Sequence, residues 1–339
     1  MSGNSAEPST PTLDGRLTAF IVRILEQLSL SAWLPAGFLA AAVTLLISFR
    51  HNENMNLVEA ITGIVENPWG IALIAIPLLL VTTTITQAFS FIAIRTLEGY
   101  WRGRGLVNVA RSLLIRRQLS RQKRLRKLRK KAIDKAFAVA RGKMLLAGWS
   151  PGVVLIFEQA SLGIDTAPDI KRGMEANIYT EEEKRLLRKV DWRIHCDPWR
   201  LARIEALGKE IESYPVRTRL MPTKLGNVLR KTEDSIKSAE GNIQGFVMRN
   251  KDRLPQRLQV DHDHYRTRLD MYSLIVFIGV FLSVLSPVML IGKISDWWAI
   301  AATSGFFVAI GVAGYFAAIA SAEAYCGILK ELDQIIQSS

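Results

Sequence analysis

Long apolar stretches lie near both ends of the chain and leave a polar centre between them. Leu30–Phe49 contains no charged side chain and has about the 20 residues that a helix needs to cross a bilayer. Trp69–Leu97 is longer, and Arg95 is its only charge. Two further uncharged stretches, 272–292 and 297–322, follow near the C-terminus. The pattern predicts four membrane-spanning helices.

The order of these stretches predicts two transmembrane hairpins joined by a large, mainly helical cytoplasmic domain. Residues 13–29 have apolar positions at helical spacing but too many charges to span, which fits an amphipathic helix at the interface or one packed on the protein. The expected regions are a disordered tail (1–12), the interfacial helix (13–29), a first hairpin (30–98, spans 30–49 and 69–97), a basic cytoplasmic domain (99–271), a second hairpin (272–322, spans 272–292 and 297–322) and a cytoplasmic tail (323–339).

Charge segregates in the same way as hydrophobicity. The chain of 339 residues carries a formal charge of +13, and the region 99–271 alone holds 38 Lys and Arg against 20 Asp and Glu. Because basic residues collect on the cytoplasmic side of membrane proteins, this region and both termini are expected in the cytoplasm. Cys196 and Cys326 lie too far apart to suggest a disulfide framework, which fits a reducing compartment. The N-terminus lacks the basic segment of a cleaved signal peptide.

The central region opens with a segment, 99–146, that contains no proline and is expected to continue the second span as one long helix. Ten of the sixteen residues in 116–131 are basic. This cluster can act as a positive-inside determinant, bind anionic lipid, contact other protein segments or contact nucleic acid. Nucleic acid is disfavoured because no aromatic residue interleaves the cluster. The candidate contact residues are Arg116, Arg117, Arg121, Arg124, Lys127 and Lys131.

The rest of the central region reads as shorter elements. Ser150-Pro151-Gly152 is expected to end the long helix, and the β-prone residues Val153–Phe157 leave open one small β element. Thr180 and Glu183 have the spacing of a capping box, so a helix is expected to begin there. Trp199–Ile211 is expected to form another helix.

A compact polar motif follows at Pro222-Thr223-x-Leu225-Gly226-Asn227-x-Leu229-Arg230-x-x-Glu233. It resembles a signature of a family of uncharacterised multi-spanning bacterial membrane proteins, most clearly from Pro222 to the third span. The resemblance implies a bacterial cell (inner) membrane and the same topology, and it implies no activity. The chain departs from the family's pattern at 249–252, where the family often has a Trp-Pro pair.

Read from the residues alone, the motif predicts a helix that begins near Pro222 and Thr223. Asn227, Arg230 and Glu233 then recur every three residues and share one face. They can form a structural clasp between this helix and the preceding stalk, or a site for a ligand or partner. The clasp is the favoured interpretation.

Candidate chemistry outside the motif is sparse. Asp261-His262-Asp263-His264 contains metal-ligand residue types, but contiguous residues do not share a helical face, so a polar juxtamembrane turn is the better interpretation. No phosphate-binding loop or nucleophile motif is present. The sequence therefore predicts no catalytic residue, no cofactor and no metal site.

Two features lie inside the expected spans. Thr83, Gln87 and Ser90 place polar groups on one face of the second span, which serves as polar contact between helices or as part of a pore. In the fourth span, small residues recur every four positions, a pattern typical of close helix packing. They are Gly305, Ala309, Ala313 and Ala317.

Together these features favour a non-enzymatic integral membrane protein. Its basic cytoplasmic domain is expected to bind a protein partner or anionic lipid, and the chain is expected to form a homo-oligomer. An oligomeric channel or transporter that uses the Thr83, Gln87 and Ser90 face is the first alternative. A membrane-tethered effector or enzyme acting through the cytoplasmic domain is the second.

Overall fold

The computed structural model describes residues 30–51, 68–101, 103, 105–239, 242–292 and 296–338, and all regular secondary structure in these ranges is helical. The chain forms two compact units. One consists of 112–222 and is called the basic unit. The other combines the described residues up to 111 with those from 223 onward and is called the bundle unit.

The bundle unit contains the apolar helices. Four of them are long and apolar enough to cross a membrane, with candidate segments at Trp33–Arg50, Leu79–Glu98, Gln256–Leu290 and Trp297–Ser338. They match the four stretches expected from the sequence. The helices of the unit are α2 (Leu30–His51), α4 (Pro68–Glu98), α10 (Lys224–Ser235), η3 (Lys237–Ala239), α11 (Ile243–Asn250), η4 (Lys251–Arg253), α12 (Gln256–Leu290) and α13 (Trp297–Ser338).

Helices α12 and α13 form the closest pair in the bundle unit, and glycine makes this approach possible. A Cβ atom on Gly279 would lie 2.8 Å from the Gly311 nitrogen and 2.8 Å from the Phe307 carbonyl oxygen. Ser304 adds a hydrogen bond to the Ser283 carbonyl at 2.7 Å. The contact therefore runs through Gly279 and Gly311, while a Cβ on Gly305 would meet nothing within 4 Å.

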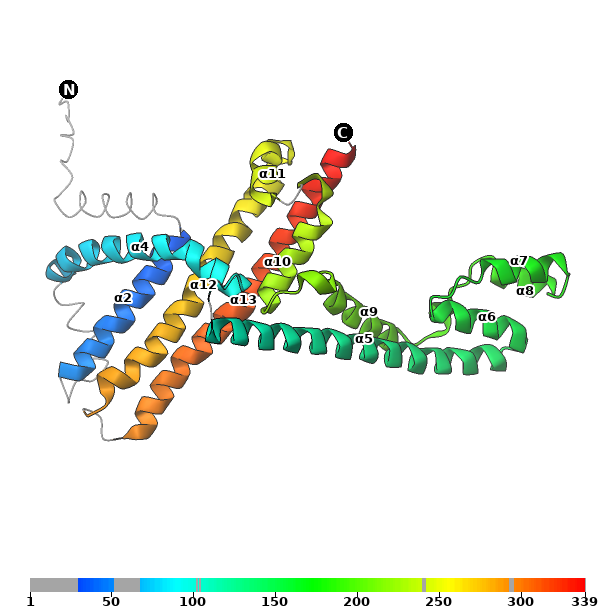
Figure 1. The fold of residues 1–339 in the computed structure, drawn as a ribbon, viewed down its shortest axis with the longest axis horizontal. Coiled ribbons are helices and arrows are strands. Elements are labelled where there is room, and N and C mark those ends of the chain that lie inside the picture. Colours follow the sequence, from blue (N-terminus) through cyan, green and yellow to red (C-terminus); the bar gives the residue numbers. More distant parts are fainter. Residues whose placement is uncertain are drawn as a thin grey trace, which may run out of the picture. The chain divides into compact units, whose positions relative to one another are not determined.

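The first two apolar helices pack on this pair in different ways. α2 lies beside α12, where Ala42 and Leu46 join a buried cluster with Ile278 and Leu282. α4 contacts α2, α12 and α10, but Figure 1 shows it running across α2 and α12 rather than alongside them. A first hairpin formed by α2 and α4 therefore remains a prediction.

The expected continuous helix from 99 to 146 is wrong, because α4 ends at Glu98 and α5 (Leu106–Leu146) begins seven residues after Gly99. Gly99 and Gly105 adopt positive φ angles of 94° and 71°, which favour glycine. Gly99 directly follows the last residue of α4, where such a residue commonly ends a helix. The Trp101 indole also donates a hydrogen bond back to the Thr96 carbonyl at 2.7 Å. The glycines of this segment thus make a turn.

The basic unit is built on an antiparallel pair of helices. α9 (Pro198–Glu212), predicted within about one residue from the sequence, packs along α5. Lys143 pairs with Asp197 at one end and Arg121 with Glu210 at the other, at 2.8 and 2.7 Å. Further elements of the unit are α6 (Pro151–Ser161), α7 (Ala167–Glu175), α8 (Glu181–Leu187), η1 (Trp192–His195) and η2 (Arg217–Arg219).

The small β element left open at Val153–Phe157 is also contradicted, because these residues lie in α6. The Ser150 hydroxyl accepts a hydrogen bond from the Val153 amide, and Pro151 occupies the first turn, where its missing N–H costs nothing. Val153, Val154, Ile156 and Phe157 are all buried in the main cluster of the basic unit. Tertiary packing of one helical face thus overrides the β propensity of the individual residues.

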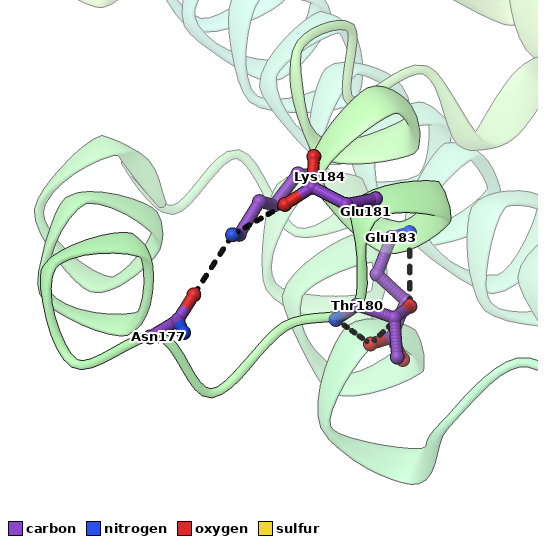
Figure 2. Close-up of polar contacts among 5 residues, drawn as sticks. All are labelled: Asn177, Thr180, Glu181, Glu183 and Lys184. Atoms are coloured by element: carbon purple, nitrogen blue, oxygen red, sulfur yellow. Dashed lines mark hydrogen bonds and ion pairs between the residues drawn. The ribbon is translucent and has the colours of Figure 1, made fainter.

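The predicted capping box at the start of α8 is confirmed. Figure 2 shows the Thr180 side chain and backbone paired with Glu183, the Glu183 amide donating to Thr180 Oγ1 at 3.3 Å and the Thr180 amide donating to the carboxylate at 2.9 Å. Lys184 reaches both Glu181 and Asn177, at 2.7 and 2.8 Å. These bonds fix the turn between α7 and α8.

The units differ in extent from the regions expected from the sequence. The basic unit covers 112–222, while α10, α11 and the start of α12 pack with α13 in the bundle unit. The extent of the cytoplasmic region, expected at 99–271, remains a prediction. Most of the expected C-terminal tail is helical, since α13 continues to Ser338. The N-terminal tail and the interfacial helix at 13–29 lie outside the described residues.

Candidate functional site

The polar motif forms the first turns of α10 and fastens them to two other helices. Thr223 is the N-cap: its hydroxyl accepts from the Gly226 amide at 3.0 Å and donates to the Glu98 carbonyl, at the end of α4, at 3.1 Å. The Lys224 amide donates to the Tyr315 hydroxyl of α13 at 3.1 Å. One threonine thus satisfies orphan groups at the end of one helix and the start of another.

The three motif residues singled out by the sequence have separate tasks. Asn227 is 1% exposed and donates to the Thr223 carbonyl at 2.7 Å, which stabilises the first turn. Arg230 donates to the Tyr100 hydroxyl at 3.1 Å and pairs with Glu233 at 2.5 Å. Arg230 therefore links α10 to the residues that follow α4. These contacts support the clasp hypothesis, and a ligand role for the same residues stays a prediction.

A cavity of about 280 Å³ opens beside these residues. It lies where α4 ends and where α12 and α13 pass beyond their apolar stretches, and three arginines and two glutamates line it. Arg230 pairs with Glu233, and Glu98 lies within electrostatic range of Arg266 and Arg95. The charged lining residues are Arg95, Glu98, Arg230, Glu233 and Arg266. The formal charges of this lining leave an excess of one positive charge, three arginines against two glutamates.

The thiols give no sign of a nucleophile. Cys326 is buried at the edge of the cavity, and Cys196 donates from its Sγ to the Ala136 carbonyl at 3.3 Å in the basic unit. Burial raises the pKa of the Cys196 thiol, which lowers the thiolate fraction and hence reactivity.

The turn expected at the Asp-His string is wrong, because residues 261–264 lie within helix α12. There His262 and Asp263 contact different neighbours. The buried His262 ring packs against Tyr325 with 5.1 Å between ring centroids. Asp263 pairs with Lys251 at 2.6 Å and contacts His262 Nδ1 at 3.0 Å. Among the residues that the structure describes, no group of three His, Cys, Asp or Glu side chains is placed to hold a metal ion.

The basic cluster is the largest concentration of uncompensated charge in the described chain. All ten basic side chains of 116–131 are exposed on α5, including the six candidate contact residues. Arg121 pairs with Glu210 at 2.7 Å, and within the described ranges the other nine have no ion pair with a carboxylate. Gln122 and Leu125 of the same stretch are buried, so the core of the basic unit and the charges use different faces of one helix.

The intramembrane polar residues do not converge on one enclosed face. Thr83 is buried, Ser90 is half-buried and Gln87 is exposed. The hydroxyls of Thr86 and Ser90 donate to carbonyls of their own helix, at 2.9 and 2.8 Å. Hydroxyls bonded in this way are satisfied within α4 and give no specific support to a conducting path.

A second hollow was not anticipated from the sequence. A groove of about 240 Å³ lies between α5 and α9, and its lining is basic with one exposed aromatic ring. The residues missed are Lys135, Trp199, Arg200 and Arg203. The i, i+4 spacing of Trp199 and Arg203, and of Lys131 and Lys135, puts each pair on one helical face, but the sequence does not show that α9 packs beside α5.

One carboxylate beside the groove, Asp197, is paired with a groove cation and with a cation outside the groove. Asp197, just before α9, accepts from Lys143 at 2.8 Å and from Arg200 at 3.2 Å. These two hydrogen bonds hold the pKa of the Asp197 carboxyl below its usual value, and the bond from Lys143 has the larger effect. Asp197 therefore stays ionised, and its negative charge partly neutralises Lys143 and Arg200 at one end of the α5–α9 pair.

Comparison of the chain with protein-family models, with curated proteins and with solved structures finds no match.

Proposed function

We propose that the chain is a non-enzymatic integral membrane protein whose basic unit binds the anionic cytoplasmic leaflet. The observation that carries the proposal is the cluster at 116–131, where ten exposed basic side chains have a single carboxylate partner in the described structure. A basic segment close to an apolar span is attracted to anionic lipid. The four apolar helices of the bundle unit supply the anchor.

The proposed topology has two hairpins, with both termini and the basic unit inside a bacterial cell membrane. Four spans and the concentration of Lys and Arg between the second and third support it. Cysteine variants at exposed positions test it: we expect Asp296→Cys to react with a membrane-impermeant maleimide on intact cells and Ser120→Cys to react only after lysis. Reaction of Ser120→Cys on intact cells would show that the chain has the opposite orientation. A cysteine placed within 52–67 tests the first hairpin in the same assay.

Lipid binding is tested with the full chain in nanodiscs of phosphatidylcholine, with and without phosphatidylglycerol. We expect phosphatidylglycerol to slow amine modification of the lysines in 116–131, read by mass spectrometry, and salt to remove the effect because the attraction is screened. Equal modification rates in both discs would reject lipid binding and leave a protein partner as the occupant of the cluster.

A homo-oligomer is the second part of the proposal. Gly305, Ala309 and Ala313 are exposed in the single chain, Ala317 is half-buried, and a small-residue face of this type allows close approach of a second helix. Gly305→Leu with Ala309→Leu is expected to reduce the mass of the particle extracted in native lipid discs. An unchanged mass would exclude this face as the contact.

A further inference from the structure

The groove between α5 and α9 has cations on both walls. Lys131 and Lys135 belong to α5, and Arg200 and Arg203 belong to α9. The two cations on each helix are separated by about one helical turn. The apolar part of the lining comes from Leu128 and Ala132. All lining residues belong to the basic unit, so the groove is formed within one compact body.

Three of the four cations have no carboxylate to neutralise them. Arg200 lies 4.3 Å above the centroid of the Trp199 ring and pairs with Asp197 at 3.2 Å. Lys131, Lys135 and Arg203 are exposed, and in the part of the chain that the structure describes no carboxylate lies within 4 Å of their charged nitrogens. Three cations that line one groove without a paired carboxylate favour an anion. Oxygens of a phosphate group accept hydrogen bonds from both Lys and Arg.

The aromatic ring distinguishes between two kinds of anion. Trp199 is 59% exposed, although burying an indole ring is strongly favourable. Beside cations, an exposed tryptophan is typical of a surface that meets the headgroup layer of a bilayer. A soluble phosphate would satisfy the three cations and leave the ring in water, whereas a phospholipid gives the ring an amphipathic environment.

We propose that this groove binds the headgroup phosphate of an anionic phospholipid between Lys131, Lys135 and Arg203, with Trp199 in the headgroup layer. The inference rests on the proposed function and adds a specific site to it. Without the groove, the basic cluster would meet the leaflet as a diffuse field of charge. With it, one lipid is held in place, so contact with the leaflet has a defined position on the α5–α9 pair.

The first measurement compares lysines within one protein, so that it needs no substitution. The full chain in phosphatidylcholine nanodiscs, with and without phosphatidylglycerol, is treated with an amine-reactive reagent, and modification is followed residue by residue. We expect phosphatidylglycerol to protect Lys131 and Lys135 at least several-fold, and to leave the exposed Lys171 and Lys189 of the same unit unchanged.

A matched pair of variants separates the site from the general charge. Lys135→Gln with Arg203→Gln removes two charges from the groove, while Arg126→Gln with Lys130→Gln removes two exposed charges of α5 outside it. Because Lys135 and Arg203 are proposed to hold the same phosphate as Lys131, we expect the groove variant to lose protection of Lys131 by on the order of tenfold. The control variant should lose much less.

The outcomes distinguish this inference from the proposed function. If phosphatidylglycerol protects the cluster but both variants respond equally, the groove is not a site and the leaflet contact remains. If no lysine of 116–135 is protected, leaflet binding itself is rejected. If inorganic phosphate, added to phosphatidylcholine discs at constant ionic strength, protects Lys131 and Lys135 as well as lipid does, the ligand is a soluble phosphate and the lipid assignment is overturned.

Discussion

The two units of this protein use charge in opposite ways. The basic unit has 25 Lys and Arg against 13 Asp and Glu, a net charge of +12, whereas the rest of the chain has 19 against 18. In the bundle unit, the arginine of the motif pairs with a glutamate of its own helix, both about a quarter exposed. In the basic unit, nine cations of one helix stand exposed without such a partner in the described structure.

This difference shows where each unit obtains its stability. The long helices of the bundle unit approach through glycine and are fastened at their ends by hydroxyl groups. The basic unit obtains its stability from a small apolar core around α6. Its uncompensated cations repel one another and therefore oppose folding rather than stabilise it. Its charges are better explained by an external partner than by its fold.

The largest expected effect comes from the core of the basic unit. Phe157 is 2% exposed and packs edge-on against Trp149 with 5.3 Å between ring centroids. Phe157→Ala should destabilise this unit by about 3–5 kcal/mol through lost burial and a cavity. Proteolysis of the full chain along a heating series, with cleavage sites identified by mass spectrometry, should show earlier cleavage within 112–222.

The bundle unit should be unaffected by that change, and the exposed Leu155 on the same helix provides the control. Leu155→Ala should leave both units as they are. If Phe157→Ala lowers the protection of both units together, they unfold as one cooperative body and the comparison above fails.

The next effect should be confined to the bundle unit. Gly279→Ala puts a methyl group 2.8 Å from backbone atoms of α13, which cannot move as a side-chain end can. Overpacking of this kind costs about 1–3 kcal/mol, so the thermal unfolding temperature in detergent should fall. Gly305→Ala, where nothing lies within 4 Å, should have little effect, and equal falls for both would mean that α12 and α13 do not meet at Gly279.

A smaller effect is expected at the N-cap of α10. Thr223→Ala removes the hydroxyl that serves both Gly226 and Glu98, at a cost of about 1–2 kcal/mol. Thr223→Ser keeps the hydroxyl and should restore most of the stability in the same unfolding assay. Failure of serine to restore it would assign the role of Thr223 to its methyl group instead.

The smallest effect concerns pH and the basic unit. The pKa of Asp197 is lowered by Lys143 and Arg200, so its contribution to stability is present above the pKa of the unfolded chain and is lost as pH falls through the lower folded value. Asp197→Asn should therefore reduce the acid-induced fall in the unfolding temperature of this unit. Glu175→Gln, at an exposed site 3.9 Å from Lys171, should not, and identical pH profiles for the wild type and Asp197→Asn would contradict the ion-pair assignment.

Several local features could be predicted because their causes lie within a few residues. The capping box at Thr180 depends on Glu183 three positions away, and the break before Pro151 depends on a short turn sequence. The helical form of the β-prone residues 153–157 could not be predicted in this way. Its helical form depends on a buried surface supplied mostly by residues distant in sequence, such as Phe137 and Trp192.

The features of the candidate sites also divide into those that the sequence predicts and those that only the tertiary structure shows. The sequence alone determined the four apolar helices, the separation of basic from apolar segments and the position of the polar motif, because each follows from composition over a continuous stretch. Only the tertiary structure decided that Arg230 meets Tyr100, that Gly279 meets Gly311 and that Trp199 and Lys131 line one groove. These contacts join residues far apart in the chain, and their formation depends on which helical faces bury together, which no local pattern specifies.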